Sequence, residues 1–229
     1  MFTRTNIQAA FREALPIMLG YVAIGLPCGI LSSSIGMDAV QMLLMGLLFY
    51  SGAGQFMIPN MWLAGSPLLS IIASVSLVNT RQMLYSASFA PWCASSSKPR
   101  AFLFAATVTD ESFGVNMNKF LAGGWSVEKS TLVNLMSQLS WTLSGVVGIF
   151  LGNAIGVPLA IASFAMTSIF ICLLVTQRIS SANIVAALTA GAGVFFCKLI
   201  GLSGIAILAG ALVGVVCAIV FVRVKEARR

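Results

Sequence analysis

The chain has 229 residues, of which 59% are hydrophobic and 8% are charged, and its mean hydropathy is +0.98. Soluble domains carry about 25% charged residues, so this composition excludes a soluble protein and predicts an integral membrane protein. The net charge of +7 comes from Lys and Arg at the ends of apolar segments. That distribution orients membrane helices and does not indicate a nucleic-acid partner.

Apolar runs broken by Gly and Pro predict helices rather than the short alternating segments of a membrane β-barrel. Their lengths predict an all-α polytopic membrane protein with about six to eight membrane segments, including broken or re-entrant helices. No loop is long enough for a soluble domain, so residues 1–229 are expected to form a single integral membrane domain. The five cysteines form no CxxC pair and histidine is absent, so neither a metal site nor a cofactor is expected.

The first apolar run, residues 15–31, follows a basic start and predicts a retained first membrane helix. Within it, Gly25 and Gly29 form a GxxxG pair, which is typical of a close contact between two helices.

The second apolar run, residues 40–50, is followed by Ser51-Gly52-Ala53-Gly54-Gln55. Two glycines beside an amide indicate an interrupted helix. Non-helical backbone is tolerated at membrane depth only where protein or a water-filled cavity covers its polar groups. Tight helix packing through small residues explains the same pattern, so both interpretations stay open.

The stretch from Asn79 to Tyr85 places polar residues in a segment otherwise suited to hydrocarbon. Arg81 and Tyr85 share one helix face, and Asn79 and Gln82 share the neighbouring face. An arginine at the membrane centre costs about 2.5–3.5 kcal/mol and normally faces a partner, a cavity or the interface. Arg81 is therefore a candidate functional residue. The alternative is an arginine at a helix end that snorkels to the lipid headgroups.

Two adjacent carboxylates, Asp110 and Glu111, follow the apolar run 101–108. At the membrane interface they would be ordinary residues of a helix N-terminal turn. The run 101–108 is too short to span a membrane alone, which favours a helix that continues with a polar face and buries them. Two carboxylates in a low dielectric rarely both ionise, so one of them is a candidate proton or ammonium site.

A count of crossings indicates broken segments. If the basic clusters at 4–12, 98–100 and 223–229 are all cytoplasmic, an even number of crossings separates each pair. Three apolar runs lie between the first two clusters and five between the last two, so each half is expected to contain one segment that is re-entrant, broken or wrongly counted. Residues 51–55 and Asn183–Lys198 are the candidates, and paired interrupted segments indicate the central site of a transporter.

Five short motifs span most of the chain. They are Phe11-Arg-Glu-Ala-Leu-Pro16, Ser51-Gly-Ala-Gly-Gln-Phe56, Asn79-Thr-Arg-Gln-Met-Leu-Tyr85 with Ala90-Pro91, Thr109-Asp-Glu-Ser-Phe113, and Ser163-Phe-Ala-Met-Thr167 with Phe170. Together they resemble the AzlC family, the large subunit of bacterial branched-chain amino-acid exporters of the LIV-E type. The chain departs from the family at Ser163, where an acidic residue is frequent, so no proton-relay role is assigned to that position.

The resemblance implies a multi-pass protein of the bacterial inner membrane that works with a small AzlD-like membrane subunit. It also implies export of valine, leucine, isoleucine or methionine. A zwitterion needs a cation for its carboxylate and an anion or carbonyls for its ammonium. We expect Arg81 to bind the substrate carboxylate. Asp110 or Glu111 is expected to neutralise Arg81 when no substrate is bound, or to bind the substrate ammonium or a coupling proton. The other candidate binding residues are Asn79, Tyr85, Gln55, Gly52 and Gly54.

Secondary transport is the expected function, since the chain has no nucleotide-binding P-loop. A passive channel, or a membrane scaffold for a partner protein, would also carry polar helix faces, with Arg81 paired structurally to a carboxylate. Saturable counterflow in proteoliposomes separates transport from both. An enzyme is not expected, because the sequence has no histidine and no evident serine–lysine arrangement.

The charge pattern predicts that the loop Ser95–Arg100 and the tail after Val222 are both cytoplasmic. Single cysteines introduced at each place, in a chain without its native cysteines, test this in intact cells. We expect labelling by a membrane-permeant reagent only. Labelling of either place by an impermeant reagent from outside would contradict the prediction.

Overall fold

A computed structural model describes residues 3–155, 180–202 and 206–227, with isolated residues between 158 and 175. Within this part of the chain every regular element is an α-helix, which confirms the expected all-α fold. Of the fifth motif, Ser163, Met166 and Phe170 lie outside the described residues.

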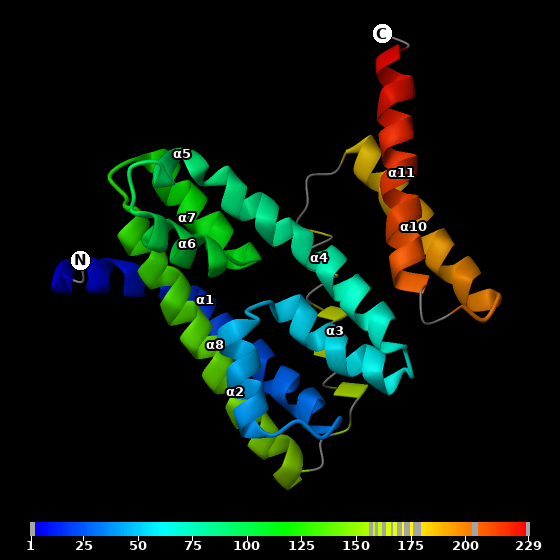
Figure 1. Ribbon diagram of the computed structural model, residues 1–229, viewed down its shortest axis with the longest axis horizontal. Helices are drawn as coiled ribbons and strands as arrows, with labels where there is room; N and C mark the ends of the chain where they lie inside the picture. Colours follow the sequence, from blue (N-terminus) through cyan, green and yellow to red (C-terminus); the bar gives the residue numbers. More distant parts are fainter. Residues whose placement is uncertain are drawn as a thin grey trace. The chain divides into compact units, whose positions relative to one another are not determined.

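The helices form two compact units, one of Met1–Pro59 and Val78–Met166, the other of Asn60–Leu77 and Thr167–Arg229. The helices of the first unit (Figure 1) are α1 (Arg4–Ser33), α2 (Ala39–Leu48), α3 (Gly52–Leu63) as far as Pro59, α4 (Leu68–Ser88) from Val78 onward, α5 (Ala90–Cys93), α6 (Lys98–Ala106), α7 (Asp110–Ala122) and α8 (Val127–Ile155). The second unit contains α10 (Ser181–Leu199) and α11 (Ala206–Ala227).

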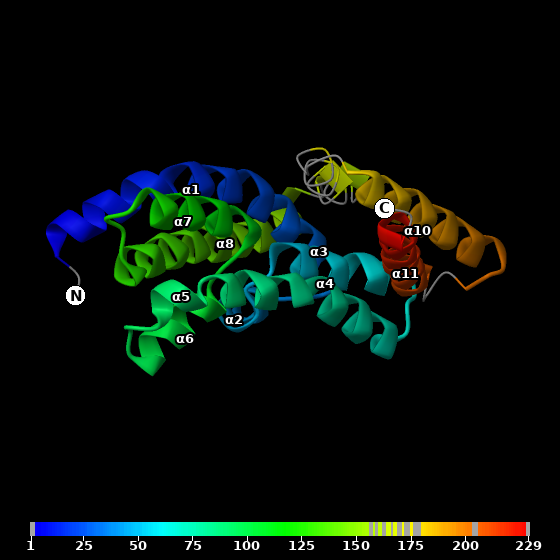
Figure 2. The ribbon, with the colours of Figure 1, turned by 90° about the horizontal axis from the view of Figure 1, so that it is seen from above.

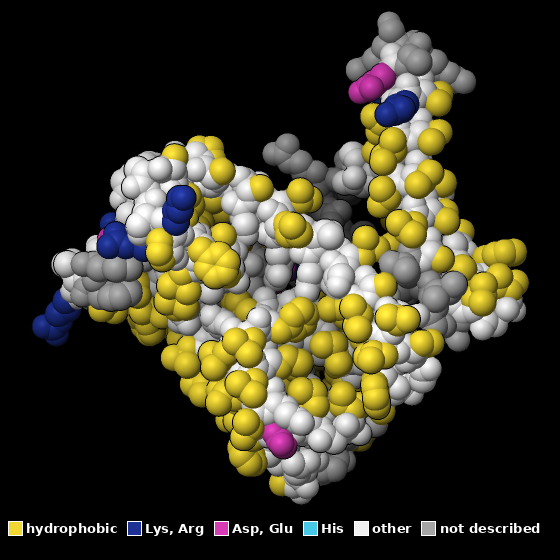
Figure 3. Space-filling model, viewed as in Figure 1, with side chains coloured by type: hydrophobic (Ala, Val, Ile, Leu, Met, Phe, Trp, Pro, Cys, Tyr) yellow, Lys and Arg dark blue, Asp and Glu magenta, His cyan; other side chains and the backbone are white. Residues whose placement is uncertain are grey.

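Among the described residues, α1, α8 and α10 contain stretches long and apolar enough to cross a membrane. Large apolar side chains are exposed as they are on lipid-facing helices, for example Leu43, Leu44, Leu47 and Leu48 of α2. Figure 3 shows such side chains over much of one face. The interruption expected at 183–198 is wrong, because α10 is one continuous helix of 19 residues.

The first unit is built around α1 and α8, which lie side by side (Figures 1 and 2). The Ser140 hydroxyl donates to the Met18 carbonyl at 2.9 Å, and further along both helices Gly152 lies against Ile30. The two helices therefore run parallel. Gly29 meets the backbone of Gly145 and Gly148 of α8, so the close contact expected from the GxxxG pair is confirmed.

Two ion pairs tie several helix ends together at one end of this unit. Lys119 near the end of α7 pairs with Glu13 of α1 at 2.7 Å, and Arg100 at the start of α6 pairs with Glu128 at the start of α8 at 3.1 Å. The chain thus enters α6 and leaves α7 at the same end. From the sequence, one helix was expected to continue from the run 101–108 through the two carboxylates. That expectation is wrong, because α6 ends at Ala106 and α7 begins at Asp110.

The C-terminal part of α4 leads toward this same end and so runs opposite to α1. At the start of this C-terminal part of α4, Asn79 accepts a hydrogen bond from Ser51. Beyond its end, Phe89 lies in an aromatic cluster with Phe104 and Phe120, with ring centroids 5.1 Å and 5.6 Å away. This cluster packs the outer parts of α6 and α7 against the α4–α5 junction.

The close approach of α1 and α8 predicts different effects for two glycines of α1. A Cβ at Gly29 would collide with the α8 backbone, whereas a Cβ at Gly20 would meet nothing within 4 Å. We expect Gly29→Ala to destabilise the protein by about 1–3 kcal/mol through overpacking, and the control Gly20→Ala to be neutral or stabilising by up to about 1 kcal/mol. Thermal unfolding in detergent measures both. Equal melting temperatures for the two variants would contradict the packing described.

Candidate functional site

Two non-helical segments of the first unit are largely buried, residues 49–51 between α2 and α3 and residues 107–109 between α6 and α7. Each break frees carbonyls at one helix end and N–H groups at the next helix start. At membrane depth these groups need partners within the protein. The side chains that supply the partners define the site.

Three glutamine side chains cap the carbonyls at the end of α2. Gln138 Nε2 of α8 donates to the carbonyls of Gly46 and Leu47 at 3.1 Å each. Gln55 Nε2 donates to the carbonyls of Phe49 at 2.6 Å and Met45 at 3.2 Å, and Gln82 Nε2 donates to that of Tyr50 at 3.2 Å. This break is therefore a fixed part of the scaffold.

The interrupted helix expected near residues 51–55 is confirmed, although the non-helical residues lie just before the glycines. Gly52 and Gly54 belong to the first turn of α3. A Cβ at Gly54 would come within 2.9 Å of the Phe49 ring, while one at Gly52 would make only ordinary contact with Trp141. Gln55 is fully buried, and its Oε1 accepts from Trp141 Nε1 at 2.8 Å.

The second break is held by α8 and α4. Asn134 Nδ2 of α8 donates to Thr107 Oγ1 at 3.3 Å and to the Phe104 carbonyl at 3.4 Å. On the other side, Ser86 Oγ of α4 donates to the Ala105 carbonyl at 2.8 Å. The start of α7 is closed by a capping box between Thr109 and Ser112.

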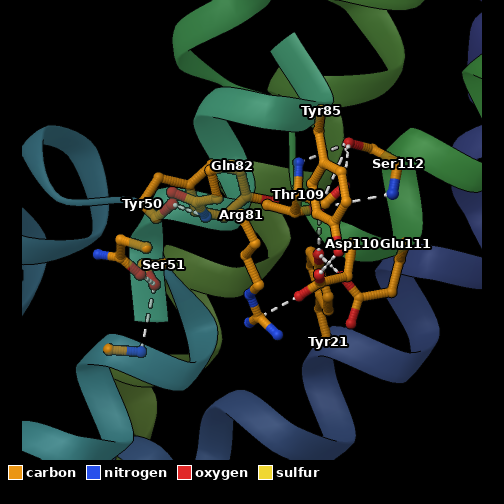
Figure 4. A network of polar contacts seen from close by, with 12 residues as sticks. Tyr21, Tyr50, Ser51, Arg81, Gln82, Tyr85, Thr109, Asp110, Glu111 and Ser112 are labelled. Carbon is orange, nitrogen blue, oxygen red and sulfur yellow. Dashed lines mark hydrogen bonds and ion pairs between the residues drawn. The ribbon is translucent and has the colours of Figure 1, made fainter. Parts of the chain in front are cut away.

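The first turn of α7 carries an ion pair with α4. Arg81 Nη2 lies 2.8 Å from Asp110 Oδ2, and the two side chains are 25% and 17% exposed. Tyr85, one turn along α4, donates its hydroxyl to Asp110 Oδ1 at 2.7 Å. Figure 4 shows the three side chains converging. Arg81 also keeps a buried Nε that has no hydrogen-bond partner.

Glu111 has different neighbours. The Tyr21 hydroxyl of α1 donates to Glu111 Oε2 at 2.6 Å and lies 2.8 Å from Thr109 Oγ1. Tyr21 itself is only 4% exposed. No Lys or Arg among the described residues lies within ion-pair distance of Glu111.

The structure thus brings together Arg81, Tyr85 and Asp110, with Glu111 beside them. Asn79 and Gln55 instead serve the first break, since Asn79 Oδ1 accepts from Ser51 Oγ at 2.6 Å. Sequence reasoning did not identify Tyr21 and Tyr50 as members of the site. The only sequence signal for either residue is a phenol inside an apolar segment.

The model of one protein family, described as AzlC protein, matches residues 16–155. The chain belongs to the AzlC family. The matched segment contains both breaks and the Arg81–Asp110 pair, and the resemblance seen in the motifs is confirmed. This chain is thus an integral, multi-pass membrane protein of the AzlC family.

Several relatives match most of this chain. A Bacillus subtilis protein named branched-chain amino acid transport protein AzlC is 26% identical over 89% of this chain and 82% of its own length. Escherichia coli inner membrane protein YgaZ is 28% identical over 91% and 88%, respectively. An uncharacterized membrane protein of Helicobacter pylori is 30% identical over 76% and 78%. No solved structure is significantly similar to this chain.

The capping of α2 predicts a large effect of removing one amide. Gln138→Leu leaves the carbonyls of Gly46 and Leu47 without their donor, and each unsatisfied buried group costs about 1–3 kcal/mol. We expect a clearly lower melting temperature in detergent. The matched control is Gln8→Leu, since Gln8 is exposed on α1. An unchanged melting temperature for Gln138→Leu would mean that this break needs no amide cap.

Proposed function

We propose that this chain exports amino acids with branched or otherwise apolar side chains, namely valine, leucine, isoleucine and methionine, by secondary transport. The observation that carries the proposal is the Arg81–Asp110 ion pair at the start of α7. An ion pair inside a membrane unit is costly unless it has a role, and this one leaves part of the guanidinium unused. The name of the Bacillus subtilis relative supports the substrate class.

Arg81 has the donors that a substrate carboxylate needs. The only ion pair of Arg81 among the described residues uses Nη2, and the buried Nε has no partner. A guanidinium binds a carboxylate best through two parallel hydrogen bonds. A substrate carboxylate is therefore expected to use Nε and an adjacent Nη nitrogen.

Asp110 supplies the matching anion for the substrate ammonium. In the empty site Arg81 and Asp110 neutralise each other. A bound amino acid enters between them, with its carboxylate on Arg81 and its ammonium on Asp110. The charge of the site is balanced in both states, so binding leaves no charge uncompensated. Tyr85 donates to Asp110 Oδ1, so it is expected to hold the Asp110 carboxylate in place while the substrate replaces Arg81 as the partner of Asp110.

The course of the chain supports a transport cycle. Within the first unit, α1 is followed by the broken pair α2–α3, and α4, running opposite to α1, is followed by the broken pair α6–α7. Helices of opposite direction, each followed by a broken segment, are typical of transporters whose substrate binds where the breaks meet. A small AzlD-like membrane subunit is proposed as the partner, and the cytoplasm as the side from which substrate is taken.

Replacing Arg81 by lysine tests the site. Arg81→Lys keeps the charge but loses the planar fork. Losing one charge-assisted hydrogen bond costs about 1.5–3 kcal/mol, which is roughly ten- to a hundredfold in the Kd for leucine. Arg81→Ala is expected to bind no leucine. Calorimetry on purified protein measures the affinities.

Arg100→Lys is the matched control, because Arg100 also pairs with a carboxylate but is exposed at the end of the unit. Its Kd for leucine should equal that of the unaltered protein. A near-normal Kd for Arg81→Lys would remove Arg81 from the binding site and favour a purely structural ion pair.

A further inference from the structure

The two neighbouring carboxylates are held in different ways. One oxygen of Asp110 lies against the Arg81 guanidinium, which is a donor only, and the other accepts from the Tyr85 hydroxyl. Protonation of Asp110 would therefore break an ion pair. Glu111 has no cation within ion-pair distance among the described residues, and its known partner is the Tyr21 hydroxyl.

We propose that Glu111, held by Tyr21, is the proton-binding site of this protein, separate from the Arg81–Asp110 site for the amino acid. The proposal deepens the proposed transport function and rests on it for the coupling of proton and substrate movement. Its ligand is a single proton delivered by hydronium. The hydronium protonates a Glu111 oxygen and leaves as water, and the carboxylic acid later gives the proton to water on the other side of the membrane.

The hydroxyl chain around Glu111 can satisfy both protonation states. With Glu111 ionised, Tyr21 donates to it at 2.6 Å. With Glu111 protonated, the acid donates to Tyr21, Tyr21 donates to Thr109 Oγ1 at 2.8 Å, and Thr109 donates to Ser112 Oγ at 3.3 Å. Only hydroxyl hydrogens reorient, and no heavy atom has to move. A buried polar group is costly when its partner is lost, so this chain lowers the cost of gaining or losing the proton.

A second buried tyrosine lies at the same place. The hydroxyl of Tyr50, in the break before α3, is buried beside the hydroxyls of Tyr21 and Thr109, and the residue is 8% exposed. Its ring meets the Tyr21 ring edge-on with centroids 6.4 Å apart, and it interacts electrostatically with Glu111. Tyr50 thus adds a hydroxyl to which a water that carries the proton can hydrogen-bond. Glu111 is exposed, so such a water can reach it.

Charge balance assigns the proton to this residue. The titratable and charged groups that surround Glu111 are Tyr21 of α1, Tyr50 before α3, Arg81 and Tyr85 of α4, and Asp110 of α7. Arg81 and Asp110 cancel each other when the site is empty, and substrate carboxylate and ammonium cancel when it is loaded. Among these groups, the negative charge of Glu111 is the one that no cation balances. A proton on Glu111 removes it.

The first test needs no amino acid. Infrared difference spectra of the purified full chain, recorded between acidic and alkaline buffer, report carboxylic acids that ionise. The six Asp and Glu side chains all contribute to the carboxylic acid band, and we expect one component of it to be lost in Glu111→Gln and kept in the control Glu128→Gln. Tyr21→Phe keeps the ring but removes the hydroxyl chain, and should shift the midpoint pH of the band. A component that is still present in Glu111→Gln, or whose midpoint is unmoved by Tyr21→Phe, would overturn the proposal.

The second test measures coupling in proteoliposomes. In the unaltered protein a pH gradient is expected to drive accumulation of leucine. In Glu111→Gln this accumulation should be lost and leucine counterflow should no longer depend on pH. Accumulation driven by the pH gradient in Glu111→Gln would overturn the proposal. If the unaltered protein shows no counterflow at all, the proposed function fails, and the infrared test still decides whether Glu111 binds the proton. If Glu111→Gln does not fold, Tyr21→Phe carries both tests.

Discussion

The constraint on which the first unit depends is that the backbone groups freed by two chain breaks must find partners without water. One helix, α8, meets much of this demand. Gln138 donates to the end of α2, and Asn134 donates to the turn after α6. Because the two residues are four positions apart, they lie about 6 Å apart along the helix axis. The two breaks are thereby brought to nearly the same level of the unit.

That placement explains where the charges lie. The second break places Asp110 and Glu111 in the first turn of α7, where negative charge suits a helix N-terminus. The parallel pair α1–α8 and the opposed α4 then present Tyr21 and Arg81 to the two carboxylates. The glycine contacts between α1 and α8 matter for the same reason, since they bring the Tyr21 hydroxyl within 2.6 Å of Glu111. Helix packing and helix capping therefore together position the side chains of the candidate site.

Much of this was predictable from the sequence. From the polar residues of the stretch 79–85 we predicted that Arg81 is functional, that it shares a helix face with Tyr85 and that it pairs with a carboxylate. The break near residue 51 was predicted from Gly52, Gly54 and Gln55. The break at 107–109 was not predictable in the same way, because Thr-Val-Thr contains neither Gly nor Pro and is held open by Asn134 and the Thr109–Ser112 capping box. The opposite error was made at 183–198, where Gly193 serves contact with Gly210 of α11 and breaks nothing. In both segments, residues distant in the sequence determine whether the helix breaks, and a local sequence pattern does not show them.

The central claim is that an amino acid is bound by exchange with the Arg81–Asp110 pair. A structure of the full chain determined with bound leucine tests it most directly. The leucine carboxylate should lie on Arg81, using the nitrogen Nε that is unpaired in the empty site, and the ammonium should lie on Asp110. Leucine bound elsewhere, with the 2.8 Å contact between Arg81 and Asp110 intact, would contradict the account.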